Sequence, residues 1–271
     1  MSKEKYKQKT DKIRAIIITI LVIILIGSIG YLTYHFYQQW SQKQEIDNVV
    51  NDIENAIEDV KNENTEKSIE DVMKEKLAEL KKENKDIIGW LKIADTNINY
   101  PVVQTDNNDY YINHNFKKKY NELGSIFLDK DCSIEKPTAN FLIYGHRSEG
   151  GQMFETLTKY KKESFYKEHK TFEFSTLNEV STYQIIAVFQ SQVYYKNQDV
   201  FKYYFFKDAK NETEFDNYIK NIKKLSMYKI EDTATYGEQL ITLSTCDYHV
   251  DDGRFAVVAK KVDWKTQIFN I

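Results

Sequence analysis

Residues 239–262 read QLITLSTCDYHVDDGRFAVVAKKV, and this stretch decides the fold class of the chain. Its two apolar runs are QLITLSTC and FAVVAKKV, and the polar segment between them is DYHVDDGR. Short apolar runs rich in β-branched residues and bounded by turn residues are typical of paired β-strands. The stretch therefore predicts two neighbouring strands, with Cys246 at the end of the first and Arg254 at the start of the second.

Five further runs with a short or alternating apolar pattern precede this pair, so the sequence predicts a mainly β body. They are residues 98–103, 125–128, 141–144, 171–174 and 183–193. Helical patterns interrupt them at residues 153–169 and at residues 211–225, where Asn211 and Glu214 form a capping-box pattern. Strands that do not alternate regularly with helices favour a barrel over a doubly wound parallel sheet.

The composition agrees with a packed, β-rich body. The chain has 271 residues, of which 41% are hydrophobic and 29% charged, and only two are proline, so a wholly disordered or collagen-like chain is excluded. Its 20 Tyr and 15 Phe suit a pleated surface. The two cysteines, Cys132 and Cys246, are too few for a disulfide framework or a four-cysteine zinc site, and no metal or other cofactor is expected.

The N-terminal segment predicts a membrane anchor. Residues 15–37 form a run of 23 residues without Lys, Arg, Asp or Glu, enough to cross a hydrocarbon core of about 30 Å as a helix. Residues 1–14 carry a net charge of +4, which predicts a cytoplasmic N-terminus and an extracellular remainder. The remainder carries −7, which argues against a nucleic-acid-binding body. A cleaved signal peptide is the alternative, but the run is longer than the apolar core of a usual signal and lacks a small-x-small cleavage site.

Residues 38–83 predict helices between this anchor and a folded domain at residues 84–271. Apolar residues recur at helical spacing over residues 46–60 and again over residues 69–80, with the polar segment KNENTEK between them. We interpret the first helix as a stalk and the second as a helix that packs against the domain. The alternative is a solvated stalk without a packing role.

Cys246 is the strongest candidate for chemistry. A thiol at a strand end beside a loop is accessible, but its reference pKa of about 8.5 leaves few thiolates at neutral pH unless a cation or base lies near. Arg254 is the nearest cation in a paired arrangement of the two strands, and its guanidinium can hold a developing oxyanion. The alternative interpretation of Cys246 is an inert buried residue.

Two histidines compete as the partner of Cys246. His146 directly follows the strand-like run NFLIYG and precedes a loop, whereas His249 is three residues from the cysteine in the turn. The spacing leaves this choice open. A metal site built on Cys246 and His249 would lack further ligands at suitable spacing. The remaining histidines are His35 in the anchor, His114 in NHNF and His169 in KEHK.

Two motifs resemble those of a known family. The segment TLSTC, followed eight residues after its cysteine by Arg254, resembles the signature of sortases, the membrane-anchored cysteine transpeptidases of Gram-positive bacteria. NFLIYGHR, residues 140–147, is similar to the segment that carries their histidine. The segments IIGWLKI, INYPVVQ, DYYINHNF and GSIFLD follow in the order of the class B branch, and the helix-bearing insert at residues 211–225 is also similar. The resemblance spans residues 84–262.

The resemblance implies an eight-stranded sortase barrel with His146, Cys246 and Arg254 as the catalytic set, and thereby selects His146 over His249. Tyr144 and Ser244 fall where class B members contact the bound peptide or its oxyanion. The implied reaction cleaves a C-terminal sorting motif of a secreted protein after Thr, through a thioacyl-enzyme, and transfers the protein to an amine of a peptidoglycan precursor. The motif stays open between NPxTx-like and LPxTG-like. The implied location is the cell membrane, with a single span and an extracellular catalytic domain.

Two other functions are compatible with the residues alone. A papain-like cell-wall cysteine peptidase also uses Cys and His, but its cysteine normally precedes its histidine, whereas His146 precedes Cys246 here. A non-catalytic, membrane-tethered wall-binding module would make the cysteine incidental. That module would leave the arrangement of Cys, His and Arg unexplained.

Overall fold

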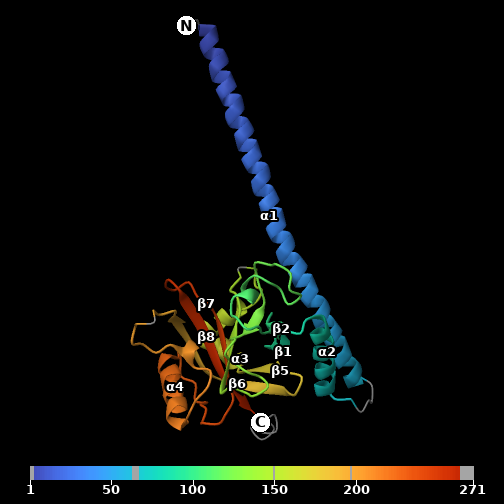
Figure 1. Cartoon of the computed structure of the whole chain (residues 1–271), viewed down its shortest axis with the longest axis vertical. Helices are drawn as coiled ribbons and strands as arrows, with labels where there is room; N and C mark the ends of the chain where they lie inside the picture. The colour runs from blue at the N-terminus through green and yellow to red at the C-terminus, as the bar shows by residue number, and fades with distance from the viewer. Residues whose placement is uncertain (1–2, 63–66, 149, 196, 263–271) are drawn as a thin grey trace. The chain divides into compact units, whose positions relative to one another are not determined.

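The computed structural model describes residues 3–62, 67–148, 150–195 and 197–262 (Figure 1). Two predicted regions lie partly outside the described residues. They are the break between the two predicted helices, at residues 63–66, and the end of the predicted domain, at residues 263–271. The chain divides into two compact units, Met1–Glu45 and Ile46–Ile271.

The predicted strand pair at the C-terminal end of the sequence is confirmed. Strand β7 (Leu240–Cys246) pairs antiparallel with β8 (Gly253–Val262), and Cys246 lies opposite Arg254 in the register. Strand β7 is buried up to its last residue and β8 is buried over Phe255–Ala259, which explains the near-continuous apolar runs. The pair therefore forms part of the core and carries two of the candidate site residues at one end.

Eight strands close into a barrel in the order β1-β2-β3-β4-β7-β8-β6-β5, so the predicted fold class is confirmed. The other six strands are β1 (Ile87–Lys92), β2 (Asn99–Val103), β3 (Ile126–Leu128), β4 (Asn140–Tyr144), β5 (Thr171–Ser175) and β6 (Val180–Gln192). The β2/β3 and β4/β7 pairs are parallel, and the remaining pairs are antiparallel. Closure gives each of these eight described strands a partner on both sides.

Strand β1 is absent from the strands that the apolar pattern predicts, because Gly89 interrupts the run IIGWLK. The structure explains this glycine. A Cβ added at Gly89 would lie 2.6 Å from the carbonyl oxygen of Ser175 on β5, and the register of β1 shifts between Ile87 and Gly89. Gly89 thus permits a close approach of two strands at an irregular position.

The helices differ from the predicted ones in detail. Residues 153–169 contain a 3₁₀-helix, η2 (Thr156–Lys161), and a short helix, α3 (Glu163–Glu168), in place of one helical stretch. Helix α4 (Glu212–Leu225) starts as predicted, with the Asn211 side chain accepting a hydrogen bond from the Glu214 backbone N–H. In a capping box the Glu214 carboxylate would accept from the backbone N–H of the N-cap residue, Asn211. Here it accepts instead from the backbone N–H of Lys210, one residue before the N-cap. Two further 3₁₀-helices are η1 (Tyr110–Ile112) and η3 (Tyr203–Phe205).

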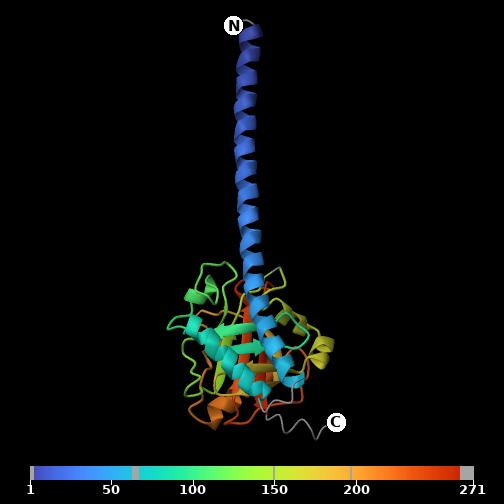
Figure 2. The same ribbon diagram turned by 90° about the vertical axis from the view of Figure 1, so that its right-hand side faces the viewer.

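Helix α2 (Ile69–Glu83) packs on the barrel at β1, and α4 packs at β6 (Figure 1). Figure 2 shows α2 crossing the face of the barrel obliquely. Ser68 caps α2 through a capping box with Asp71, which satisfies the first free backbone N–H groups. The apolar face of α2 is buried in the same core cluster as the barrel strands.

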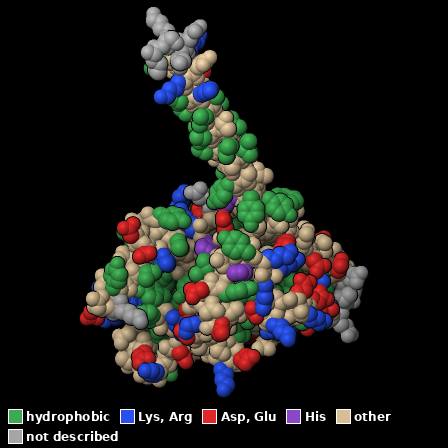
Figure 3. Space-filling model, turned by 45° about the horizontal axis from the view of Figure 1, so that its top comes forward, with side chains coloured by type: hydrophobic (Ala, Val, Ile, Leu, Met, Phe, Trp, Pro, Cys, Tyr) green, Lys and Arg blue, Asp and Glu red, His purple; other side chains and the backbone are tan. Residues whose placement is uncertain are grey.

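Helix α1 (Lys3–Asn62) contains the predicted anchor at residues 15–37. It is the one helix of the described residues that is long and apolar enough to cross a membrane, and its apolar window is not buried in the protein. Figure 3 shows hydrophobic side chains along α1 after the basic side chains at its N-terminal end. In the second unit, Ile46 and Ile53 of the same helix are buried in the core cluster of the barrel.

Candidate active site

The five predicted site residues line one pocket of about 260 Å³. These residues are Tyr144, His146, Ser244, Cys246 and Arg254. The pocket also includes residues that the sequence analysis did not identify, namely Asn108, Ile112, Phe127, Gly145 and Thr245. The structure therefore brings together residues from the ends of β4, β7 and β8, from the segment before β3 and from β3 itself.

The parallel pairing of β4 with β7 explains why His146 and Cys246 meet. Tyr144 lies opposite Ser244 in the register, and the two candidate residues each follow two positions later. Neighbouring parallel strands end at the same edge of a sheet, so the segments that leave them start side by side. Arg254 lies opposite Cys246 on the antiparallel neighbour β8, which brings the third candidate to the same edge.

Backbone contacts hold the segment with His146 against β7. The Gly145 N–H donates to the Ser244 carbonyl at 3.2 Å, and the Thr245 hydroxyl donates to the Gly145 carbonyl at 2.8 Å. A side chain at Gly145 would clash with the ring of Phe154, since a Cβ there would lie 2.7 Å from its Cδ2. The glycine before His146 is thus required by close packing.

The His146 ring has a fixed hydrogen-bond partner. Its Nε2 lies 2.7 Å from the carbonyl oxygen of Ile112. A carbonyl oxygen only accepts hydrogen bonds, so Nε2 carries a proton and donates it. Nδ1 is therefore the nitrogen that is free to take up and release a proton. No hydrogen bond joins His146 to Cys246 within the described part of the chain.

Arg254 has no carboxylate partner among the described residues. Its Nη1 donates to two backbone carbonyls of its own turn, those of Asp252 at 3.2 Å and Gly253 at 2.9 Å. These contacts orient the guanidinium without neutralising its charge. The charge is available to stabilise a thiolate or an oxyanion in the pocket.

The rival histidine, His249, does not line the pocket. Its Nδ1 lies 2.9 Å from the Asp247 carboxylate within the turn between β7 and β8. His114 and His169 stack on aromatic rings, those of Tyr110 and Phe165 respectively, with ring centroids 4.1 Å apart in both pairs. The structure thus places His146 alone of these histidines in the pocket.

Ser244 and Tyr144 both point their hydroxyl groups at buried partners. The Ser244 hydroxyl lies 2.6 Å from that of Tyr203, and burial raises the pKa of Tyr203 to about 12. The Tyr144 hydroxyl donates to the Asp129 carboxylate at 3.0 Å. A bound peptide would meet hydroxyl groups whose orientation is already set by the protein.

Asp247 organises the loops next to the pocket, and the sequence analysis did not identify it. The residue is buried, and its carboxylate accepts hydrogen bonds from Arg147 at 3.1 Å, Lys161 at 2.6 Å and Gln190 at 2.6 Å. Burial alone would raise the pKa of Asp247, but the hydrogen bonds from Gln190 and Lys161 outweigh it and lower the pKa. The only sequence signal is an acidic residue directly after a buried strand.

Both cysteines are free; Cys132 is buried, whereas Cys246 is partly exposed. The Cys132 thiol donates to the Asn140 carbonyl at 3.3 Å, and burial raises its pKa to about 11. Cys132 is therefore a poor nucleophile. No group of three or more His, Cys, Asp or Glu side chains in the described segments is arranged to hold a metal ion.

Comparison with known proteins gives one consistent family. A family model described as "Sortase domain" matches residues 91–262. Sortase B of Listeria monocytogenes is 35% identical over 192 residues, which cover 70% of this chain and 75% of that protein. Sortase B of Staphylococcus aureus is 33% identical over 183 residues, which cover 67% of this chain and 72% of that protein.

Solved structures agree with this result. A Staphylococcus aureus sortase B–substrate complex superposes with a TM-score of 0.71 at 25% identity and covers 84% of this chain and 99% of that chain. Sortase B from Bacillus anthracis in complex with AAEK1 gives a TM-score of 0.62 at 34% identity, covering 69% of this chain and 84% of that chain. The similarity therefore extends over the barrel and not only over the two motifs.

Proposed function

Because this chain belongs to the sortase family and is a class B sortase, a cysteine transpeptidase, we propose that Cys246 is its nucleophile and His146 its acid–base residue. The observation that carries the proposal is the meeting of these residues and Arg254 in one pocket at a shared strand edge. The papain-like peptidase and the non-catalytic wall-binding module are set aside by the family membership.

In the first step, the Cys246 thiolate attacks the carbonyl carbon of Thr in the sorting motif. The carbonyl oxygen becomes an oxyanion, which the Arg254 guanidinium stabilises. His146, protonated on both nitrogens, transfers its Nδ1 proton to the leaving amine as the C–N bond breaks. The other proton stays on Nε2 throughout and is donated in the hydrogen bond to the Ile112 carbonyl, because that hydrogen bond forms in both charge states of the ring. The product is a thioester on Cys246.

In the second step, an amine attacks this thioester. His146 Nδ1 takes the proton that the amine nitrogen loses, the new amide bond forms, and Cys246 leaves as the thiolate. We propose that the amine belongs to a peptidoglycan precursor. Water can replace the amine and release a free carboxylate, so slow hydrolysis is the side reaction of the same site.

The sortase family acts on sorting-motif substrates, and we propose that the substrate of this chain is the C-terminal sorting motif of a secreted protein, either NPxTx-like or LPxTG-like. Tyr144 and Ser244, which line the pocket, are proposed to contact the bound peptide. The apolar part of α1 fits a membrane anchor. We propose a single span with a cytoplasmic N-terminus, supported by the charge of +4 on residues 1–14, and an extracellular catalytic domain.

Intact-mass spectrometry tests the proposal. The full chain in detergent micelles is incubated with a panel of sorting-motif peptides, with and without a small amine. The expected result is a mass increase equal to the acyl half of one peptide, which the amine converts into a ligated product. Cys246→Ala abolishes the adduct and His146→Ala slows its formation, whereas Cys132→Ala and His169→Ala, changed outside the pocket, retain it.

Two results would overturn the proposal. One is an adduct that persists in Cys246→Ala. The other is the absence of an adduct with every peptide, combined with a Cys246 thiol that does not react with iodoacetamide. A reactive Cys246 without an adduct instead calls for a wider peptide panel.

A further inference from the structure

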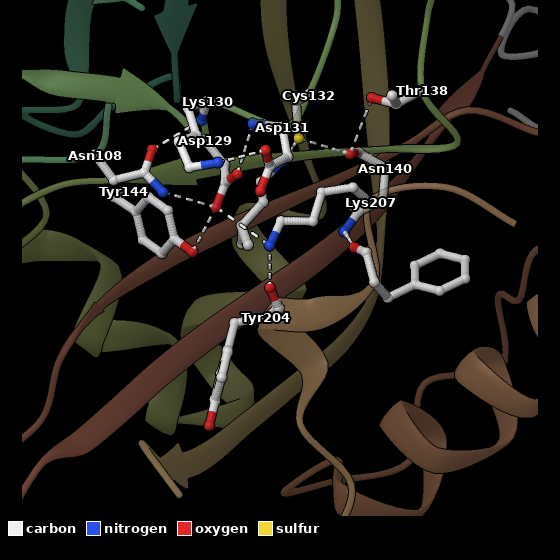
Figure 4. Close-up of polar contacts among 12 residues, drawn as sticks. Asn108, Asp129, Lys130, Asp131, Cys132, Thr138, Asn140, Tyr144, Tyr204 and Lys207 are labelled. Carbon is white, nitrogen blue, oxygen red and sulfur yellow. Dashed lines mark hydrogen bonds and ion pairs between the residues drawn. The ribbon is translucent and has the colours of Figure 1, made fainter. Parts of the chain in front are cut away.

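A buried carboxylate lies directly behind the wall of the pocket. Asp129 follows strand β3 and is 1% exposed. Its Oδ2 atom accepts from the Tyr144 hydroxyl at 3.0 Å and the Asn108 side-chain amide at 3.2 Å, and both donors belong to residues that line the pocket (Figure 4). Its Oδ1 atom accepts from the Asp131 backbone N–H at 2.9 Å.

The charge of Asp129 is balanced by one lysine. Lys207 Nζ lies 3.3 Å from the same Oδ2 atom and also donates to the Tyr204 carbonyl (Figure 4). The Lys207 backbone is fixed as well, because its carbonyl accepts from the Asn140 N–H at 2.8 Å at the start of β4. A buried carboxylate is tolerated only when it is paired and hydrogen-bonded in this way.

The ion pair determines what the Tyr144 hydroxyl can offer to a ligand. Burial and the adjacent Asp129 charge raise the pKa of Tyr144, so the hydroxyl keeps its proton. That proton is committed to Asp129. The hydroxyl oxygen is left with its acceptor capacity alone.

The ion pair also fixes the Asn108 amide. Its Oδ1 atom accepts from the Lys130 backbone N–H at 2.8 Å, and its Nδ2 atom donates one proton to Asp129. The flipped amide would place a donor against the Lys130 N–H and an acceptor against the carboxylate, so only one orientation is satisfied. One N–H of Asn108 remains for a ligand.

Tyr144 thus presents a hydrogen-bond acceptor to the pocket, and Asn108 presents a donor, and neither role can be reversed. We propose that Asp129, held by Lys207, is a positioning residue that sets this pattern and through it selects a peptide amide group of the sorting peptide. An amide N–H can donate to Tyr144, and an amide carbonyl can accept from Asn108. This inference rests on the proposed function, because it assigns the groups that hold the acylating peptide.

A depsipeptide scan in the full chain tests the inference. Each backbone amide of the best sorting peptide is replaced in turn by an ester, which removes one N–H and weakens one carbonyl acceptor. The wild-type enzyme loses about tenfold in kcat/KM at one position, because a buried acceptor is left unpaired there. Asp129→Asn and Tyr144→Phe lose this sensitivity at the same position and raise KM for the amide peptide about fivefold, with kcat within about twofold.

Matched variants separate positioning from general structure. Lys207→Arg keeps the positive charge and is expected to keep the ester sensitivity of the wild type. Lys207→Met removes the charge and is expected to lose the ester sensitivity. Glu238→Gln breaks the 3.0 Å ion pair with Lys260 at the far end of β7 and β8 and leaves KM unchanged. The double variant Asp129→Asn/Tyr144→Phe is no worse than the more severe single variant, because both changes remove the same interaction.

The outcomes distinguish the inference from the proposed function. Ester sensitivity that persists in Asp129→Asn overturns the inference and leaves the proposed function intact. A wild-type enzyme that forms no adduct with any peptide and whose Cys246 thiol does not react with iodoacetamide overturns both. If Asp129→Asn fails to fold, the Lys207→Arg and Lys207→Met pair and Tyr144→Phe provide the same comparison.

Discussion

The guanidinium of Arg147 lies 3.1 Å from the carboxylate of Asp247, and these two residues directly follow His146 and Cys246 in the chain. The Asp247 side chain is 1% exposed and that of Arg147 is 23% exposed, so water screens the pair weakly. Arg147 also donates to Glu155 at 3.2 Å and lies over the ring of Tyr248. The ion pair therefore joins the two loops that carry the proposed acid–base residue and nucleophile.

We expect Asp247→Asn to lower both stability and turnover. The change leaves Arg147 and Lys161 without their shared counter-charge and lowers the free energy of unfolding by about 1–3 kcal/mol. Looser loops misalign His146 and Cys246, which lowers kcat about tenfold. Thermal unfolding and steady-state transpeptidation measure the two effects. Asp251→Asn, an exposed change in the same turn, is the control and leaves both values unchanged.

The same carboxylate predicts an acid limit to stability. Because the pKa of Asp247 is lower in the folded protein than in the unfolded chain, its ionised form stabilises the fold at pH values above the unfolded pKa. This contribution begins to decrease as the pH falls below the unfolded pKa of about 4 and is gone once the pH is below the folded pKa. The difference in unfolding free energy between the wild type and Asp247→Asn is expected to shrink over that range. A difference that stays constant down to pH 3 would contradict this assignment.

The sequence predicts those parts of the site whose residues are close in the chain, and not those that depend on distant segments. Cys246 and Arg254 face each other across a single turn, so the apolar pattern was sufficient to place them at one strand end. The meeting of His146 with Cys246 depends on the parallel pairing of β4 with β7, whose register partners lie far apart in the chain. No local pattern encodes that pairing, and only the family resemblance selected His146.

The buried charges could not be predicted from the sequence. Asp129 and Asp247 each follow a short apolar strand, where an acidic residue normally marks a solvated turn. Both are buried because a cation from a distant segment, Lys207 or Lys161, reaches them. Such pairs depend on the folded path of the whole chain and leave no spacing signal.

Lys223 is expected to stabilise the end of α4 without affecting catalysis. Its ammonium group donates to the backbone carbonyls of Ile186 at 3.1 Å, Ile230 at 2.5 Å and Asp232 at 2.6 Å. Lys223→Met removes these bonds and lowers the free energy of unfolding by about 1–3 kcal/mol, with kcat/KM unchanged. Lys224→Met, the exposed neighbouring lysine, is the control in the same thermal unfolding experiment. An equal effect of both variants would show that helix propensity, and not the carbonyl contacts, is responsible.

The tautomer of His146 gives the most direct test of the proposed proton transfer. Nε2 donates to the Ile112 carbonyl, so the neutral ring carries its proton on Nε2 and leaves Nδ1 as the base. His169 is an internal control with the opposite tautomer. Its Nδ1 lies 3.0 Å from the Phe165 carbonyl oxygen, so Nδ1 carries the proton of the neutral ring. Long-range ¹H–¹⁵N correlation spectra of the full chain at high pH are expected to show opposite tautomers for the two rings. An Nδ1–H tautomer at His146 would contradict the mechanism, since that ring could not accept a proton on Nδ1 from the attacking amine.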